Sequence, residues 1–254
     1  MAILRFFCDE SWDGNVTVKV RSFTVAGFIA KDSEWRRLSS QWSKRLEKEG
    51  ISRFHAAPLN GKKDEFAGWS ADRSKNFTLS LLRAIGRRKI LAVSFSILLD
   101  PYEKLSNKDK EILGTPYLLC FKHLVETVAT ITDLLPKEDQ IAFVFDDHEE
   151  RDAIISLFYL LKNTKPYGDR LAICTSGSWK EHVELQPADL LAYETFKFLS
   201  NGGTRKSLRK ALENILVNVA IYGGMFEAEA FEKIAKILAE GREFSSLDGG
   251  PSTI

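Results

Sequence analysis

The stretch ILRFFCDES, residues 3–11, has the composition of a buried strand that ends in two acids. A second stretch, IAFVFDDH at residues 141–148, shows the same arrangement. A third acid, Asp189, lies in the first turn of a helix predicted from Pro187 to Leu199. A charge at the tip of a core strand is costly to remove from water unless something compensates it. Three such acids, distant in the sequence, therefore suggest ligands gathered around a metal ion.

Predicted strands and helices alternate along the rest of the chain. Strands are predicted at 2–8, 22–30, 90–99, 141–145 and 171–174. Helices are predicted after caps at Asp32 or Ser33, at Ser70 and at Thr115, and then at 149–162, 187–199, 204–218 and 227–240. Three leading strands followed by alternating helices and strands predict an α/β fold, and this order resembles the ribonuclease H-like arrangement of a mixed sheet flanked by helices. The strand at 141–145 is apolar on both faces, so we expect it to be central.

The same pattern predicts one main domain with additions. The ribonuclease H-like domain is expected at residues 1–200, with a helical insertion at 32–88 after the second strand. Within it, Gly and Pro make residues 50–69 look like loop. A C-terminal helical appendage is expected at 201–243, and the Gly-rich segment 244–254 is expected to be a mobile tail.

Bulk composition sets few limits on partners. The 254 residues include 36 Lys and Arg against 35 Asp and Glu, and the resulting net charge of +1 neither favours nor excludes nucleic acid. Cys8, Cys120 and Cys174 are isolated in apolar runs, which indicates reduced core thiols and a cytoplasmic protein. No signal-peptide pattern precedes Asp9, and no apolar run is long enough to cross a membrane.

Each acid also has an explanation that needs no metal. Asp9 and Glu10 point to opposite faces if the strand persists, so one can reach a site while the other faces solvent or a helix, and the pair can also be a polar strand end. Asp146 or Asp147 could cap the helix that follows. The helix dipole alone would stabilise Asp189.

Several other polar residues stand out in the sequence. His55 lies between apolar residues in a predicted loop, which would hold its ring at a pocket edge, whereas His148 is expected to be exposed. Gln186 is a poor capping residue, so its amide is expected to serve a contact. Basic runs at 83–89 and 205–210 are expected to be solvated faces, with contact to phosphate as the alternative.

Taken together, these motifs resemble the bacterial domain-of-unknown-function 3800 (DUF3800) family. The similarity covers roughly residues 3–200, and its motifs are Asp9-Glu10-Ser11, Phe54-His55, Asp146 after a strand, and Gln186-x-Ala188-Asp189-Leu190. The resemblance implies a ribonuclease H-like fold and a metal-dependent nuclease.

On this hypothesis Asp9, Asp146 and Asp189 hold Mg²⁺ or Mn²⁺. His55 then moves a proton or positions a phosphate of a nucleic-acid substrate.

One departure from the ribonuclease H-like pattern leaves alternatives open. Such nucleases commonly add a glutamate from the helix after the third strand, and the predicted helix 116–135 offers only Glu126 and Asp133. An alternative hypothesis is therefore a non-catalytic ribonuclease H-like module that binds nucleic acid or a protein partner. A third is hydrolysis of another bond by paired carboxylates acting as acid and base.

Overall fold

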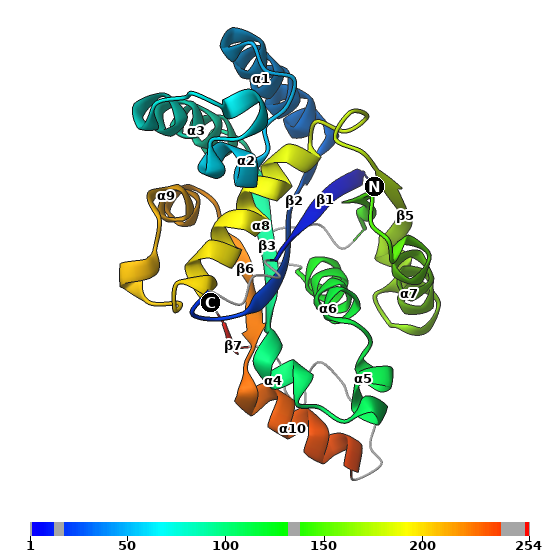
Figure 1. The fold of residues 1–254 in the computed structure, drawn as a ribbon. Helices are drawn as coiled ribbons and strands as arrows, with labels where there is room; N and C mark the ends of the chain where they lie inside the picture. The colour runs from blue at the N-terminus through cyan, green and yellow to red at the C-terminus, as the bar shows by residue number, and fades with distance from the viewer. Residues whose placement is uncertain (1, 13–17, 132–137, 240–251, 254) are drawn as a thin grey trace.

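A seven-stranded mixed sheet forms the centre of the molecule (Figure 1). The structure is a computed structural model that describes residues 2–12, 18–131, 138–239 and 252–253. Across the sheet the strand order is β5-β4-β1-β2-β3-β6-β7. The strands are β1 (Ile3–Trp12), β2 (Ser22–Lys31), β3 (Ile90–Leu98), β4 (Gln140–Asp146), β5 (Leu171–Gly177), β6 (Ile221–Phe226) and β7 (Ser252–Thr253). Helices flank this sheet, so the predicted α/β class with a mixed sheet is confirmed.

Strand directions bring the ends of three strands to one edge of the sheet. β1, β2 and β3 form an antiparallel meander, in which Cys8 lies opposite Gly27 and Gly27 lies opposite Val93. β4 runs parallel to β1, and β5 runs parallel to β4. The carboxyl ends of β1, β4 and β5 therefore point the same way, which is where ligands bind in open α/β sheets.

Helices cover both faces of the sheet (Figure 1). One layer contains α1 (Asp32–Glu49), α2 (Ala56–Gly61), α3 (Ala71–Gly86), α8 (Leu185–Ser200) and α9 (Lys210–Asn218). The other contains α4 (Leu99–Glu103), α5 (Asn107–Leu113), α6 (Pro116–Thr130), α7 (Arg151–Thr164) and α10 (Ala228–Ala239). Short 3-10 turns are η1 (Asp64–Phe66), η2 (Gly168–Arg170) and η3 (Arg205–Ser207).

Alternating side chains of β1 feed two separate cores. Phe6 and Cys8 are buried with α6, α7 and α10 on one face, whereas Phe7 is buried with α1, α3 and α8 on the other. Residues 22–30 of β2 are buried throughout, as a central strand covered on both faces must be. All three cysteines are buried free thiols. None of the helices in the described ranges combines the length and the apolar character that crossing a membrane requires.

Local signals predicted two helix caps correctly, but other helix starts were wrong, including α9, which begins at Lys210 rather than near residue 204. Ser70 and Thr115 accept hydrogen bonds from the third residue of α3 and α6, so both predicted caps are confirmed. α1 instead begins at Asp32, with Lys31 at the N-cap and no side-chain cap. The predicted loop at 50–69 is also not loop throughout, because it contains α2 and η1.

The C-terminal part differs from the helical appendage predicted at 201–243. It contains α9 and α10, but between them β6 joins the sheet beside β3. The run Ile221-Tyr222-Gly223-Gly224 hid this strand because paired glycines are typical of a turn. Most of the predicted mobile tail, 244–251 and 254, lies outside the described residues. Ser252 and Thr253 form β7 and pair with β6.

Candidate active site

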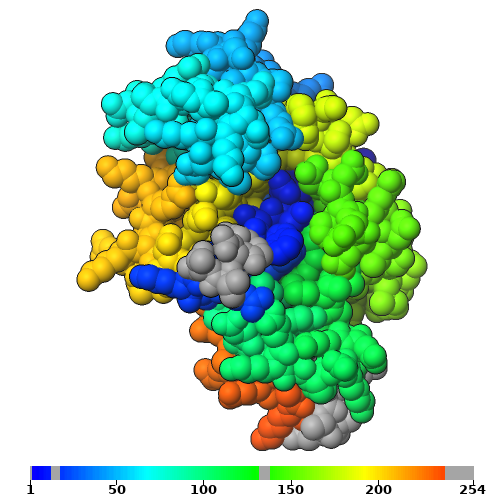
Figure 2. All heavy atoms as spheres, in the orientation of Figure 1, coloured from blue at the N-terminus to red at the C-terminus, as the bar shows by residue number. Residues whose placement is uncertain are grey.

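Four residues that the sequence singled out line one small pocket. Asp9 of β1, Asp146 at the end of β4, Asp189 of α8 and His55 before α2 surround a cavity of about 70 Å³. Figure 2 shows the dark-blue atoms of β1 in a hollow between the cyan atoms of the α2 region and the green atoms of α6 and α7. The sheet edge therefore brings together acids that lie far apart in the sequence, while their roles stay predictions.

Asp9 occupies the interior of its strand rather than the strand end. β1 continues past it, and Asp9 lies opposite Ala26 of β2, so the strand-end explanation is wrong. Its Oδ1 accepts a hydrogen bond of 2.8 Å from the backbone N–H of Glu10. Burial raises the pKa of Asp9 well above its ordinary value, and the carboxylates of Glu10, Asp189 and Asp146 raise it further.

Asp146 ends β4, where it lies opposite Gly177 of β5. The N-cap of the following helix α7 is Glu150, and no side chain caps that helix by a hydrogen bond. Capping by Asp146 or Asp147 therefore does not explain these acids. Burial raises the pKa of Asp146, while the positive charge of Arg53 opposes this shift.

Two side chains at the start of α8 hold the loop that leads into α2. Gln186 is only 3% exposed. Its Oε1 accepts hydrogen bonds from Trp42 Nε1 at 3.0 Å and from the backbone N–H of Phe54 at 2.8 Å. Asp189 Oδ2 accepts a hydrogen bond of 2.8 Å from the backbone N–H of Ala56. The contact predicted for the Gln186 amide is thus confirmed, and α8 fixes the backbone on both sides of His55.

Asp189 carries a proton more readily than an ordinary aspartate. α8 begins at Leu185, so Asp189 lies beyond the first turn, contrary to the prediction, and the helix dipole fades within that turn. Burial raises the pKa of Asp189 to about 7, with the backbone N–H of Ala56 lowering it and the charge of Asp146 raising it. The pocket therefore concentrates negative charge that the protein itself balances poorly.

His55 is the neutral base of this pocket. Its ring is half-buried, and Nδ1 makes no hydrogen bond to any described residue. Burial lowers the pKa of His55, and the charge of Arg53 lowers it further, while Asp64 opposes the shift. An imidazole with a lowered pKa is unprotonated at neutral pH, so His55 can accept a proton there.

Arg53, Trp179 and Leu185 also line the pocket and were not predicted from the sequence. The Arg53 guanidinium lies 4.8 Å from the centroid of the Trp179 ring, a cation–π arrangement. Arg53 directly precedes Phe54-His55, so its place in that motif was the available signal. Trp179 lies in a loop after β5 and carried no signal.

Glu10 is a fourth acid whose charge acts on Asp9 and Asp189. Burial raises its pKa, while the charge of His148 opposes the shift and that of Asp146 adds to it. Glu10 Oε2 accepts no hydrogen bond within the described part of the chain. His148 is half-buried against Tyr117, with ring centroids 4.4 Å apart, so the expectation of an exposed loop histidine was wrong.

The glutamate considered from α6 does not join the pocket. Glu126 is buried beside His123, with Oε2 3.4 Å from Nδ1. The other acid considered, Asp133, lies outside the described residues. Among the described residues of α6 (Pro116–Thr130), none lines the cavity.

The three aspartates share a pocket without forming a ready ligand set. Within residues 2–12, 18–131, 138–239 and 252–253, no group of three His, Cys, Asp or Glu side chains is arranged to hold a metal ion. The donor chemistry nevertheless fits a hard divalent cation, since such ions prefer carboxylate oxygens. The raised pKa values of Asp9, Asp146 and Asp189 also indicate negative charge that a cation would stabilise.

Comparison with known proteins adds no family assignment. No protein-family model matches this chain, and no curated protein matches it significantly. The resemblance to the DUF3800 family therefore stays a prediction from the motifs.

Proposed function

We propose that this chain is a metal-dependent phosphodiester hydrolase acting on nucleic acid. The observation that carries the proposal is the meeting of Asp9, Asp146 and Asp189 in one pocket with His55. These residues come from β1, β4, α8 and the loop before α2, so no single local feature accounts for all four. Perturbed acids and a neutral base gathered in a cavity are typical of catalytic sites.

The order of the strands supports a ribonuclease H-like arrangement and membership of the DUF3800 family. An antiparallel meander of β1, β2 and β3 leads the chain, and α6, β4, α7, β5 and α8 then alternate. The motifs that resemble the family also meet in space, because Gln186 and Asp189 contact the backbone of 54–56.

Each residue of the pocket would have its own role in hydrolysis. Asp9, Asp146 and Asp189 would hold one or two Mg²⁺ or Mn²⁺ ions. A metal ion held there would supply activation of the attacking water and stabilisation of the leaving oxygen. His55, whose pKa burial lowers, would accept a proton from the water. Arg53 attracts the phosphate, and Trp179 offers a ring on which a base can stack.

The test is cleavage of labelled DNA, RNA and RNA–DNA hybrid by the purified chain in Mg²⁺ and in Mn²⁺. We expect cleavage of at least one substrate, lost on addition of EDTA and reduced at least about a hundredfold in Asp9→Asn and Asp146→Asn. Asp152→Asn is the matched control, because Asp152 is an exposed acid of α7 outside the pocket. Equal cleavage by the pocket variants and this control, or no cleavage of any substrate, would refute the proposal.

A non-catalytic binding module is the second candidate. It is favoured by the lack of a ready metal-ligand group among the described residues. Such a module would bind nucleic acid without metal and tolerate Asp9→Asn, and its affinity would fall with salt. A gel-shift titration in EDTA with wild type and this variant separates it from the hydrolase.

A further inference from the structure

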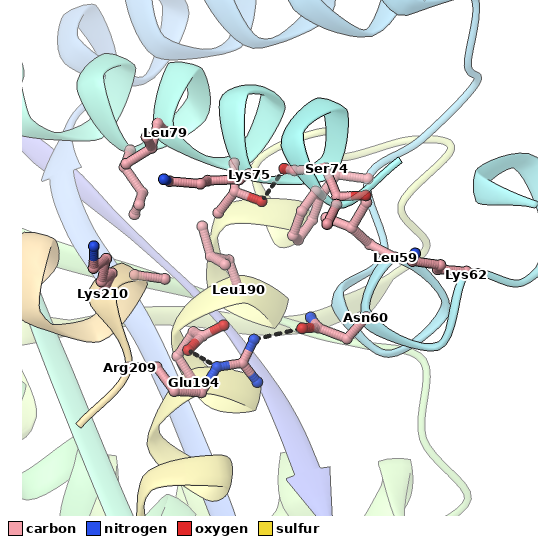
Figure 3. A pocket seen from close by; sticks show the side chains of 15 residues that line it. Leu59, Asn60, Lys62, Ser74, Lys75, Leu79, Leu190, Glu194, Arg209 and Lys210 are labelled. Carbon is pink, nitrogen blue, oxygen red and sulfur yellow. Dashed lines mark hydrogen bonds and ion pairs between the residues drawn. The ribbon is translucent and has the colours of Figure 1, made fainter. Parts of the chain in front are cut away.

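A second, larger cavity lies between α2, α3, α8 and α9. Its volume of about 320 Å³ falls at the lower end of the range of small-molecule sites, about 300–1,000 Å³. Figure 3 shows Lys75 entering from the α3 side, Lys210 from α9, and Leu190 of α8 between Lys75 and Arg209. No step of the proposed hydrolysis uses this cavity.

The walls combine an apolar floor with a basic rim. Leucines from three helices line the floor, namely Leu59, Leu79, Leu82 and Leu190. Lys62, Lys75 and Lys210 are exposed at the rim. An apolar slot with cations at its opening fits a ligand that has a flat, weakly polar body and an anionic group.

One buried carboxylate faces this slot. Glu194 is 1% exposed, and its Oε2 lies 3.2 Å from Arg209 Nε without accepting a hydrogen bond from any described residue. Arg209 is fixed from the other side by a hydrogen bond to Asn60 Oδ1. The expectation that basic residues 205–210 form only a solvated face is therefore wrong for Arg209. Burying a carboxylate with an unused acceptor is costly, and a ligand N–H donor would relieve this cost.

We propose that this cavity binds a guanosine 5′-phosphate unit. The base lies on the leucine floor and presents its Watson–Crick edge to Glu194. Guanine offers two neighbouring N–H donors on that edge, whereas uracil places acceptors on both sides of its single N–H. The phosphate lies between Lys75 and Lys210, whose ammonium groups lie on the same side of the cavity (Figure 3). Arg209 pairs with the Glu194 carboxylate at 3.2 Å.

The unit can be a free nucleotide or part of a strand, and the wall shared by the two pockets supports the strand. Phe54 lines both this cavity and the acid pocket. Asp189 and Glu194 lie on the same helix, about 7.5 Å apart along its axis at about 1.5 Å per residue. The strand version rests on the proposed nuclease function, because the guanine would then select where the acid pocket cleaves. The free-nucleotide version does not.

Isothermal titration calorimetry of the full chain with GMP, AMP, CMP and UMP in EDTA tests the binding directly. We expect GMP to bind at least about tenfold more tightly than UMP, and Glu194→Gln to remove most of this preference. The double variant Lys75→Ala, Lys210→Ala should bind all four nucleotides more weakly, and its affinity should depend less on salt. The buried Glu194 is unchanged in this variant. Lys108→Ala, an exposed lysine of α5 outside the cavity, should change nothing.

A second arm distinguishes the two sources of the unit and separates this proposal from the hydrolase. GMP binding that Asp9→Asn leaves unchanged, with no cleavage of any strand, would support a free-nucleotide site and refute only the nuclease. Weak GMP binding with cleavage placed at a fixed distance from guanine, lost in Glu194→Gln, would support the strand subsite. Equal binding of the four nucleotides together with cleavage that ignores guanine would overturn the guanosine site.

Discussion

Asp189→Asn should make the metal-free protein more stable at neutral pH, although it removes a residue of the candidate active site. The amide keeps an oxygen that can accept the hydrogen bond from the Ala56 N–H, so the α8–α2 contact survives. What the substitution deletes is a buried charge that repels Asp146.

The magnitude follows from the pKa of Asp189, which burial raises from 3.8 to about 7. Because the folded-state pKa lies above the unfolded one, the folded protein binds the extra proton. Stability therefore falls as pH rises from about 4 to about 7 and is constant above that. At about 1.4 kcal/mol per pKa unit, the shift corresponds to about 4 kcal/mol. Part of the shift comes from repulsion between Asp189 and neighbouring acids, and their own pKa values fall when Asp189 is replaced. We therefore expect Asp189→Asn to raise the free energy of unfolding by about 2–4 kcal/mol at pH 8.

Urea unfolding followed by tryptophan fluorescence, at pH 5 and pH 8 in EDTA, measures this gain. Wild type should lose stability between the two pH values, whereas Asp189→Asn should lose less, because only the other acids with raised pKa values then remain. Added Mn²⁺ should stabilise wild type and leave the variant nearly unchanged, because only the intact acids offer it ligands. Asp152→Asn should behave as wild type. A variant that is less stable than wild type at pH 8, or that keeps the full pH dependence, would refute the reasoning.

Three further predictions concern the surroundings of the pocket. His55→Ala should lower the cleavage rate by about 10²–10⁴-fold with little change in melting temperature, since its Nδ1 has no described partner. Gln186→Leu should cost about 2–4 kcal/mol in urea unfolding, because Trp42 Nε1 and the Phe54 N–H lose their acceptor in the core. Gly27→Ala should destabilise the fold by about 1–3 kcal/mol, because a Cβ there would lie 2.1 Å from the carbonyl oxygen of Phe7; a melting temperature equal to wild type would contradict the close strand contact.

The sequence predicted the sheet elements well where hydrophobic periodicity was strong. The alternation in β3 and the apolar run in β4 follow directly from which side chains are buried. The positions of both strands could therefore be predicted from the local sequence. β6 could not, because Gly223 and Gly224 carry no side chain to pack and look like a turn. Its pairing with β3 depends on contacts with a segment far away in the chain.

Asp146 was predictable because it ends an apolar strand. Asp9 and Asp189 were singled out for similar positions, although β1 continues past Asp9 and Asp189 lies beyond the first turn of α8. Trp179 comes from an irregular loop that only the folded chain brings to the pocket. Glu194 was also hidden, because a glutamate within a predicted helix usually faces water. Its burial accompanies the packing of α8 against α9 and the ion pair with Arg209, which no local pattern encodes.

Burying several acids that repel one another destabilises the fold. This is the strongest physical argument that the acid pocket acts on a ligand. Neutral amides could make the hydrogen bonds that Asp9 and Asp189 make here, without mutual repulsion. A purely structural role therefore predicts that Asp9→Asn and Asp189→Asn leave every measurable property unchanged or improved. A catalytic role predicts that both variants are more stable in EDTA and no longer cleave in Mn²⁺. This stability–activity trade-off is expected where a binding site holds charges that repel each other. Measuring both quantities on the same two variants decides between the hydrolase and the binding module, because only the hydrolase requires them to change in opposite directions.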